Sequence, residues 1–173
     1  MKLFLRLSYL GTAYNGYQVQ GDQPTVQREL TRACAELFGE RCDIVGCSRT
    51  DSGVHANEFC ATVSQKGCED IITSLPPERV PLAFSAHLPP DICVFDASWV
   101  ASDFHPRYDV VSKEYLYRII NRGVYDPFEY GRVCFVPRKI TSDALQNMRL
   151  AARHIVGRHD FAAFMSEGSD ITD

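Results

Sequence analysis

An aspartate between an arginine and two small residues is the feature of this sequence best suited to chemistry. Residues 48–55 read Ser-Arg-Thr-Asp-Ser-Gly-Val-His, and the Ser-Gly pair after Asp51 is typical of a tight turn. Apolar residues at 44–46 and 59–63 predict a strand on each side of this turn. A carboxylate held ionised in a shielded cleft can act as a nucleophile or a base. An ordinary turn without a catalytic role is the alternative.

Arg49 favours the catalytic interpretation over the ordinary turn. It precedes Asp51 by two residues, and in an extended segment such positions project to the same side. We therefore expect the Arg49 guanidinium to hold the Asp51 carboxylate ionised and oriented.

The segment resembles the Gly-Arg-Thr-Asp-Ala-Gly-Val-His motif of the tRNA pseudouridine synthase A family, whose aspartate is catalytic. Ser48 and Ser52 replace the glycine and the alanine of that motif, small residue for small residue. Residues 9–20 are similar to the family's Tyr-Asp-Gly-Thr-x-Tyr-x-Gly-Trp-Gln-x-Gln, with Tyr17 in place of tryptophan. Three further matches follow in order: Phe-His-Pro-Arg at 104–107, Lys-Glu-Tyr-Leu-Tyr-Arg at 113–118, and Gly-Arg-His-Asp-Phe-Ala-Ala-Phe at 157–164.

The resemblance implies an enzyme that isomerises uridine to pseudouridine in the anticodon stem-loop of tRNA, at positions thirty-eight to forty. Asp51 is then the catalytic residue, and the reaction requires no metal and no organic cofactor. Arg49, His105 and Arg107 are expected to bind the RNA substrate. The carboxylate could add covalently to the substrate or take a proton from the sugar, and the sequence leaves both routes open.

Tyr115 occupies the position of a family tyrosine that stacks on the target base. If residues 113–121 form a strand, Lys113, Tyr115 and Tyr117 share one face, which suits stacking of an unpaired base. A cross-strand aromatic pair in a core is the alternative interpretation.

The composition fits a globular chain, although its net charge is unusual for a protein that binds nucleic acid. The 173 residues are 45% hydrophobic and carry a formal net charge of -4. Residues 104–158 nevertheless contain ten Lys and Arg against five Asp and Glu, so a basic stripe could follow an RNA backbone. Ordinary solvated faces are the alternative.

Cysteine usage and hydropathy bear on whether the protein contains disulfides, a zinc site or a membrane span. Seven cysteines without a Cys-x-x-Cys pair argue against a disulfide framework and a zinc site, and we expect most of them to be buried packing residues. No apolar run reaches the roughly 18 residues that span a bilayer, so we expect a cytoplasmic protein without membrane association.

Hydrophobic periodicity predicts an α+β fold with a mixed, mostly antiparallel sheet and helices packed on one face. The expected helix after Thr25 has this residue as its N-cap and ends at Gly39. Strands are expected at 2–9, 42–47, 58–65, 92–100, 113–121 and 131–136, and further helices at 68–75, 82–87 and 141–156.

The resemblance adds an expected domain organisation. It implies the pseudouridine synthase fold of two ferredoxin-like halves, with residues 1–100 as the N-terminal half that carries the Asp51 turn. Residues 101–173 would begin a truncated C-terminal half. Family members continue past the His-Asp-Phe segment to an arginine that pairs with the catalytic aspartate, and this sequence shows no such stretch.

Two other functions therefore stay open. One is a catalytically incomplete RNA-binding module or fragment of the enzyme. The other is an unrelated hydrolase with Asp51 as nucleophile, which leaves the remaining motifs unexplained. For the full-length form the resemblance also implies a homodimer.

Overall fold

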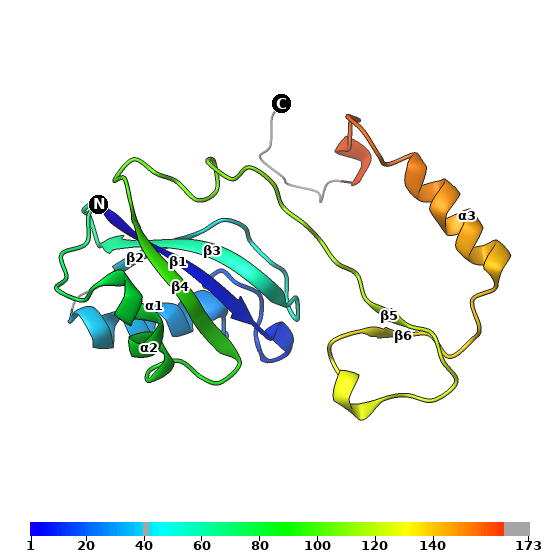
Figure 1. Ribbon diagram of the computed structural model, residues 1–173, viewed down its shortest axis with the longest axis horizontal. Helices are drawn as coiled ribbons and strands as arrows, with labels where there is room; N and C mark the ends of the chain where they lie inside the picture. The colour runs from blue at the N-terminus through cyan, green and yellow to red at the C-terminus, as the bar shows by residue number, and fades with distance from the viewer. Residues whose placement is uncertain (40–41, 165–173) are drawn as a thin grey trace. The chain divides into compact units, whose positions relative to one another are not determined.

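The alternating apolar residues at the start of the chain form an inner strand of a four-stranded sheet (Figure 1). The computed structural model describes residues 1–39 and 42–164. The strands lie in the order β2-β3-β1-β4, and each neighbouring pair is antiparallel. Their bounds are β1 (Lys2–Tyr9), β2 (Cys42–Gly46), β3 (Ala56–Gln65) and β4 (Ile92–Val100). The predicted strands at 2–9 and 92–100 and the mostly antiparallel α+β architecture are confirmed.

Two helices, α1 (Val26–Phe38) and α2 (Val80–Ser85), cover one face of this sheet (Figure 1). Thr25 begins α1, because its hydroxyl accepts the Arg28 N–H at 3.3 Å, and Gly39 ends it with a φ of 68°. Side chains of both helices bury in the same core as the inward residues of β1: Val26, Leu30, Ala33, Cys34, Val80 and Phe84 against Leu3, Leu5 and Leu7. Burial of each Val, Leu or Phe side chain in this set contributes about 1.5–3 kcal/mol.

The helix predicted at residues 68–75 is wrong. The Gln65 N–H donates to the Asp70 carbonyl at 2.8 Å, and the Ile71 N–H donates to the Met1 carbonyl at 3.1 Å, so the segment lies against the start of β1. Consecutive β-branched residues and the following Pro76 disfavour a helix here. Next comes a single 3₁₀ turn, Pro77–Arg79, which leads into α2 at Val80 instead of the expected Leu82.

The chain divides into two compact units. The first comprises residues 1–117 with 129–132, and the second comprises residues 118–128 and the described residues from 133 on. In the second unit, β5 (Ile119–Ile120) pairs in parallel with β6 (Cys134–Phe135). The described chain therefore contains both antiparallel and parallel strand pairs. Its helix α3 (Ser142–Arg153) begins after Thr141, whose hydroxyl accepts the Ala144 N–H at 3.2 Å. Short 3₁₀ turns occupy Gly11–Ala13, Pro127–Glu129 and Ala162–Phe164.

The strand predicted at residues 113–121 is wrong over most of its length. Only Ile119 and Ile120 pair with another strand, and residues 113–118 join no ladder in the described part of the chain. The alternating pattern is present, but a strand also needs a neighbour for its N–H and C=O groups. The strand predicted at 131–136 is shortened to two residues for the same reason.

Burial of the cysteines also differs from expectation. Of the seven cysteines, Cys34 and Cys42 are buried, Cys68 and Cys93 are exposed, and the other three are half-buried. Across residues 1–39 and 42–164, none of the helices has the length and apolar character that crossing a bilayer demands.

Candidate functional site

Asp51 lies in the connection between β2 and β3, at residues 47–55. The Val54 N–H donates to the Asp51 carbonyl at 3.2 Å, and Gly53 adopts a φ of 78° that an L-amino acid side chain rarely tolerates. This geometry explains the Ser-Gly pair and confirms the expected turn. The Asp51 side chain is exposed.

A second loop, residues 9–17, clamps the backbone on both sides of Asp51. The Tyr17 N–H donates to the Thr50 carbonyl at 3.1 Å, and the Gly53 N–H donates to the Tyr14 carbonyl at 3.2 Å. We call these residues the clamp loop. They hold the turn through main-chain groups, so the position of Asp51 depends on the fold of the first 17 residues.

Two glycines make this close approach possible. A Cβ atom added at Gly11 would lie 1.9 Å from the Val54 carbonyl oxygen, and one at Gly16 would lie 2.4 Å from the Thr50 carbonyl oxygen. Gly16 also has a φ of 83°. The sequence analysis does not anticipate that both glycines contact the Asp51 turn. Their spacing within the segment 9–20 was the available signal.

Side chains add to the clamp. The hydroxyls of Tyr9 and Thr50 lie 2.9 Å apart, and burial raises the pKa of Tyr9 to about 12. The Gly11 N–H donates to His55 Nδ1 at 2.9 Å, which leaves the proton of a neutral ring on Nε2, 2.7 Å from the Gly131 carbonyl oxygen. His55 therefore supports the turn structurally.

Arg49 does not pair with Asp51 as expected. Within the described residues, no ion pair or hydrogen bond involves the Asp51 carboxylate, and Arg49 has no acidic partner. The reason is that β2 ends at Gly46, so residues 49 and 51 leave the strand geometry that would place them on one side.

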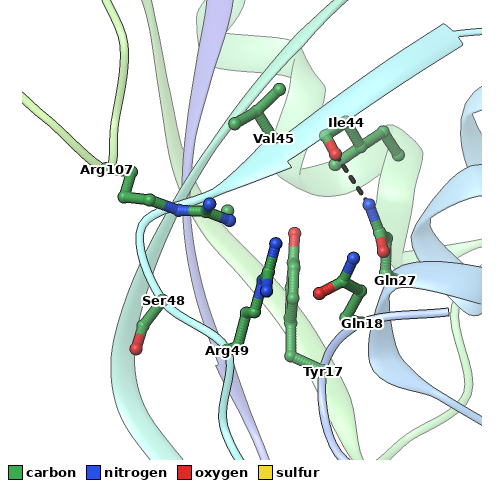
Figure 2. A pocket seen from close by; sticks show the side chains of 9 residues that line it. Tyr17, Gln18, Gln27, Ile44, Val45, Ser48, Arg49 and Arg107 are labelled. Carbon is green, nitrogen blue, oxygen red and sulfur yellow. Dashed lines mark hydrogen bonds between the residues drawn. The ribbon is translucent and has the colours of Figure 1, made fainter. Parts of the chain in front are cut away.

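The Arg49 side chain instead lines a cavity of about 160 Å³. Figure 2 shows the guanidinium groups of Arg49 and Arg107 directed toward the space beside the Tyr17 hydroxyl. The structure thus brings together two of the predicted RNA-binding residues. The full lining is Tyr17, Gln18, Gln27, Ile44, Val45, Gly46, Ser48, Arg49 and Arg107.

Tyr17 was not selected from the sequence as a functional residue. Its ring packs on Phe59 with centroids 4.4 Å apart and lies so near Gly46 that a Cβ atom there would be 2.5 Å from it. Burial raises the pKa of the Tyr17 hydroxyl, so this group keeps its proton. No hydrogen-bond partner satisfies it among the described residues.

His105 and Arg107 belong to a tight turn after β4. The Arg107 N–H donates to His105 Nδ1 at 3.2 Å, the His105 N–H donates to Asp109 Oδ2 at 2.7 Å, and the His105 ring stacks on Tyr108. Pro106 between them is buried. The turn fixes the base of the Arg107 side chain and leaves its guanidinium free to point into the cavity.

Tyr115 is 78% exposed in the segment that joins no strand. The alternative of a core aromatic pair does not fit this exposure, and the stacking role stays a prediction. In the described part of the chain, no group of three or more His, Cys, Asp or Glu side chains is placed to hold a metal ion.

Comparison with curated proteins finds relatives over nearly the whole chain. The chain is 41% identical over 162 residues to tRNA pseudouridine synthase A of Methylacidiphilum infernorum, across 94% of this chain and 60% of the relative. It is 38% identical to tRNA pseudouridine synthase A of Clostridium acetobutylicum, across 96% of this chain and 65% of the relative. It is 39% identical to tRNA pseudouridine synthase A of Bacillus pumilus, across 100% of this chain and 67% of the relative. The chain therefore spans 60–67% of the length of these relatives. No family model matches the chain.

Proposed function

Because the chain belongs to the tRNA pseudouridine synthase A family, we propose that this protein isomerises uridine to pseudouridine in tRNA. The observation that supports this most is the Asp51 turn. Its backbone is fixed from two sides by the clamp loop, while its carboxylate is exposed and has no ion partner in the described residues. That combination suits a carboxylate that must meet a substrate at a defined place.

The reaction breaks the bond from C1' to N1 of the uridine, turns the uracil, and joins C1' to C5. The C5 proton leaves and N1 gains a proton, so the product is an isomer and no redox cofactor is needed. We assign Asp51 either to covalent addition or to removal of a sugar proton. Tyr115 would stack on the target base, and Arg49, His105 and Arg107 would bind the RNA.

Finer features of the proposal follow from the family motifs. The target would be the anticodon stem-loop at positions thirty-eight to forty, and the full-length protein would be a cytoplasmic homodimer. Its fold would be the pseudouridine synthase fold of two ferredoxin-like halves, with residues 1–100 in the first half and 101–173 in the second. The excess of basic residues between 104 and 158 supports an RNA path along the chain.

Substitution of Asp51 by Asn tests the proposal. The variant keeps the shape of the side chain and removes its charge, so it should abolish pseudouridine formation and leave tRNA affinity within a few-fold of the wild-type value. Carbodiimide adduct mapping of incubated tRNA measures the product. Asp22→Asn is the matched control, because Asp22 is fully exposed and lies outside the clamp loop and the Asp51 turn. Turnover near the wild-type rate in Asp51→Asn would refute the assignment.

The Asp51 carboxylate, exposed and without an ion partner in the described residues, also favours a second candidate, an RNA-binding module without turnover. An open site shields charges poorly and holds a freed base poorly. Salt-dependent tRNA binding by the wild-type chain, without any pseudouridine formed, would support this candidate over the enzyme.

A further inference from the structure

The Tyr17 hydroxyl is a buried donor for which residues 1–39 and 42–164 supply no acceptor. Tyr17 is 2% exposed, and its hydroxyl reaches the cavity without a hydrogen-bond partner in the described residues. Polar groups buried this deeply are normally hydrogen-bonded. The hydroxyl therefore calls for an acceptor supplied from outside the chain.

The charges around this hydroxyl select the kind of acceptor. None of the nine lining residues is acidic, and the guanidinium groups of Arg49 and Arg107 have no carboxylate partner among the described residues. Both polar groups of the Gln27 side chain already have partners. Its Nε2 donates to the Ile44 carbonyl at 2.8 Å (Figure 2), and its Oε1 accepts the Val19 N–H at 3.0 Å. One hydroxyl donor and two guanidinium groups thus point into the same space, and this arrangement suits a negatively charged oxygen ligand.

The size of the cavity limits what can enter it. Its volume of about 160 Å³ lies below the roughly 300–1,000 Å³ of sites that enclose a whole small molecule. A single tetrahedral group carried by a larger ligand fits this volume better than a complete cofactor. Arg49 also stands two residues from Asp51, so a ligand held here would extend toward the Asp51 turn.

We propose that the Tyr17 cavity seats one phosphodiester group of the RNA strand, which accepts hydrogen bonds from the Tyr17 hydroxyl, Arg49 and Arg107. This inference rests on the proposed function for the identity of the ligand. The anchored phosphate fixes the register of the strand, and the neighbouring nucleotide then reaches Asp51. Tyr17 acts as a positioning residue in this arrangement, because it contacts the backbone of the RNA and not the reacting atoms.

Two probes without uridine test the site separately from isomerisation: inorganic phosphate and a short oligoadenylate, titrated into the full 173-residue chain by calorimetry. Tyr17→Phe removes only the hydroxyl and should weaken the binding of both probes by about tenfold. Phosphate should compete with oligoadenylate. The control Ser85→Ala also removes only a hydroxyl and should bind like the wild-type chain, because the Ser85 hydroxyl donates to the Leu82 carbonyl at 2.7 Å, outside both the cavity and the clamp loop.

Arg107→Gln provides a second, independent variant if Tyr17→Phe fails to fold, as judged by circular dichroism. It should lower the slope of log affinity for oligoadenylate against log salt concentration by about 0.7, the value for one phosphate contact on a single strand. Wild-type affinity in Tyr17→Phe, or an unchanged salt slope in Arg107→Gln, would overturn the proposal. Phosphate binding that does not compete with oligoadenylate would overturn the RNA source and indicate a small-molecule anion site.

Discussion

Gly16 lies where any larger residue would push against the backbone that precedes Asp51, so Gly16→Ala tests the clamp directly. The added Cβ atom would lie 2.4 Å from the Thr50 carbonyl oxygen, whereas real Cβ atoms essentially never approach closer than 3.0 Å. The Thr50 carbonyl also accepts the Tyr17 N–H, so the loop and the turn must move apart at the point where they are bonded.

The expected loss of stability has two parts. A φ of 83° costs an alanine about 1–2 kcal/mol relative to glycine. Overpacking against a fixed carbonyl costs about 1–3 kcal/mol more. Because Asp51 follows Thr50 directly, we expect the displacement to pass to the Asp51 carboxylate, and a shift on the order of 1 Å can lower turnover by about 100-fold if this group is catalytic as proposed.

Gly67→Ala is the matched control for this substitution. Gly67 has a φ of 77°, but a Cβ atom added there would meet nothing within 4 Å, so only the conformational cost of about 1–2 kcal/mol should remain. Urea unfolding of both variants and pseudouridine formation on tRNA are the measurements. Equal losses of stability in the two variants, or wild-type turnover by Gly16→Ala, would show that the clamp does not position Asp51.

Two further predictions concern an exposed aromatic residue and a surface carboxylate. We expect Tyr115→Phe to keep most of the turnover and Tyr115→Ala to lose it, because the exposed ring offers a face on which a base can stack. If both variants lose pseudouridine formation on tRNA to the same extent, the Tyr115 hydroxyl instead acts on the C5 proton. Hydrogen bonds from His87 and Arg32 lower the pKa of the Glu36 carboxyl, so its contribution to stability is present above the ordinary pKa of Glu and is lost as pH falls through the lowered pKa. Urea unfolding at a series of pH values should therefore find Glu36→Gln less stable than the wild-type chain near neutrality and equally stable in acid, and a difference that grows in acid would refute this.

Elements with local signals could be predicted from the sequence. Helix α1 is an example, because its N-cap Thr25, its apolar stripe and its final Gly39 all act within the segment itself. The same holds for β1, whose alternation is realised because partners exist on both of its sides. Residues 113–118 alternate as well, yet they join no ladder in the described chain, and periodicity carries no information about whether a neighbour is present.

The candidate site shows the same division between local and distant causes. The Asp51 turn follows from Asp-Ser-Gly, a local signal. The clamp depends on contacts between residues 11–17 and 50–54, which only the folded chain brings together. The position of Tyr17 likewise depends on Phe59 and Gly46, which lie far from it in the sequence.

Because Arg49 does not pair with Asp51, other groups hold the Asp51 turn and Arg49 lines the cavity. An arginine held against a carboxylate stabilises its charge and makes it a weaker base. In this structure the clamp loop holds the backbone around Asp51 instead, and the exposed carboxylate has no ion partner among the described residues. Arg49 is then available to the cavity, where Arg107 and Tyr17 meet it. We therefore expect the placement of Asp51 and the attachment of the RNA to depend on different contacts, so that Gly16→Ala and Tyr17→Phe impair them separately.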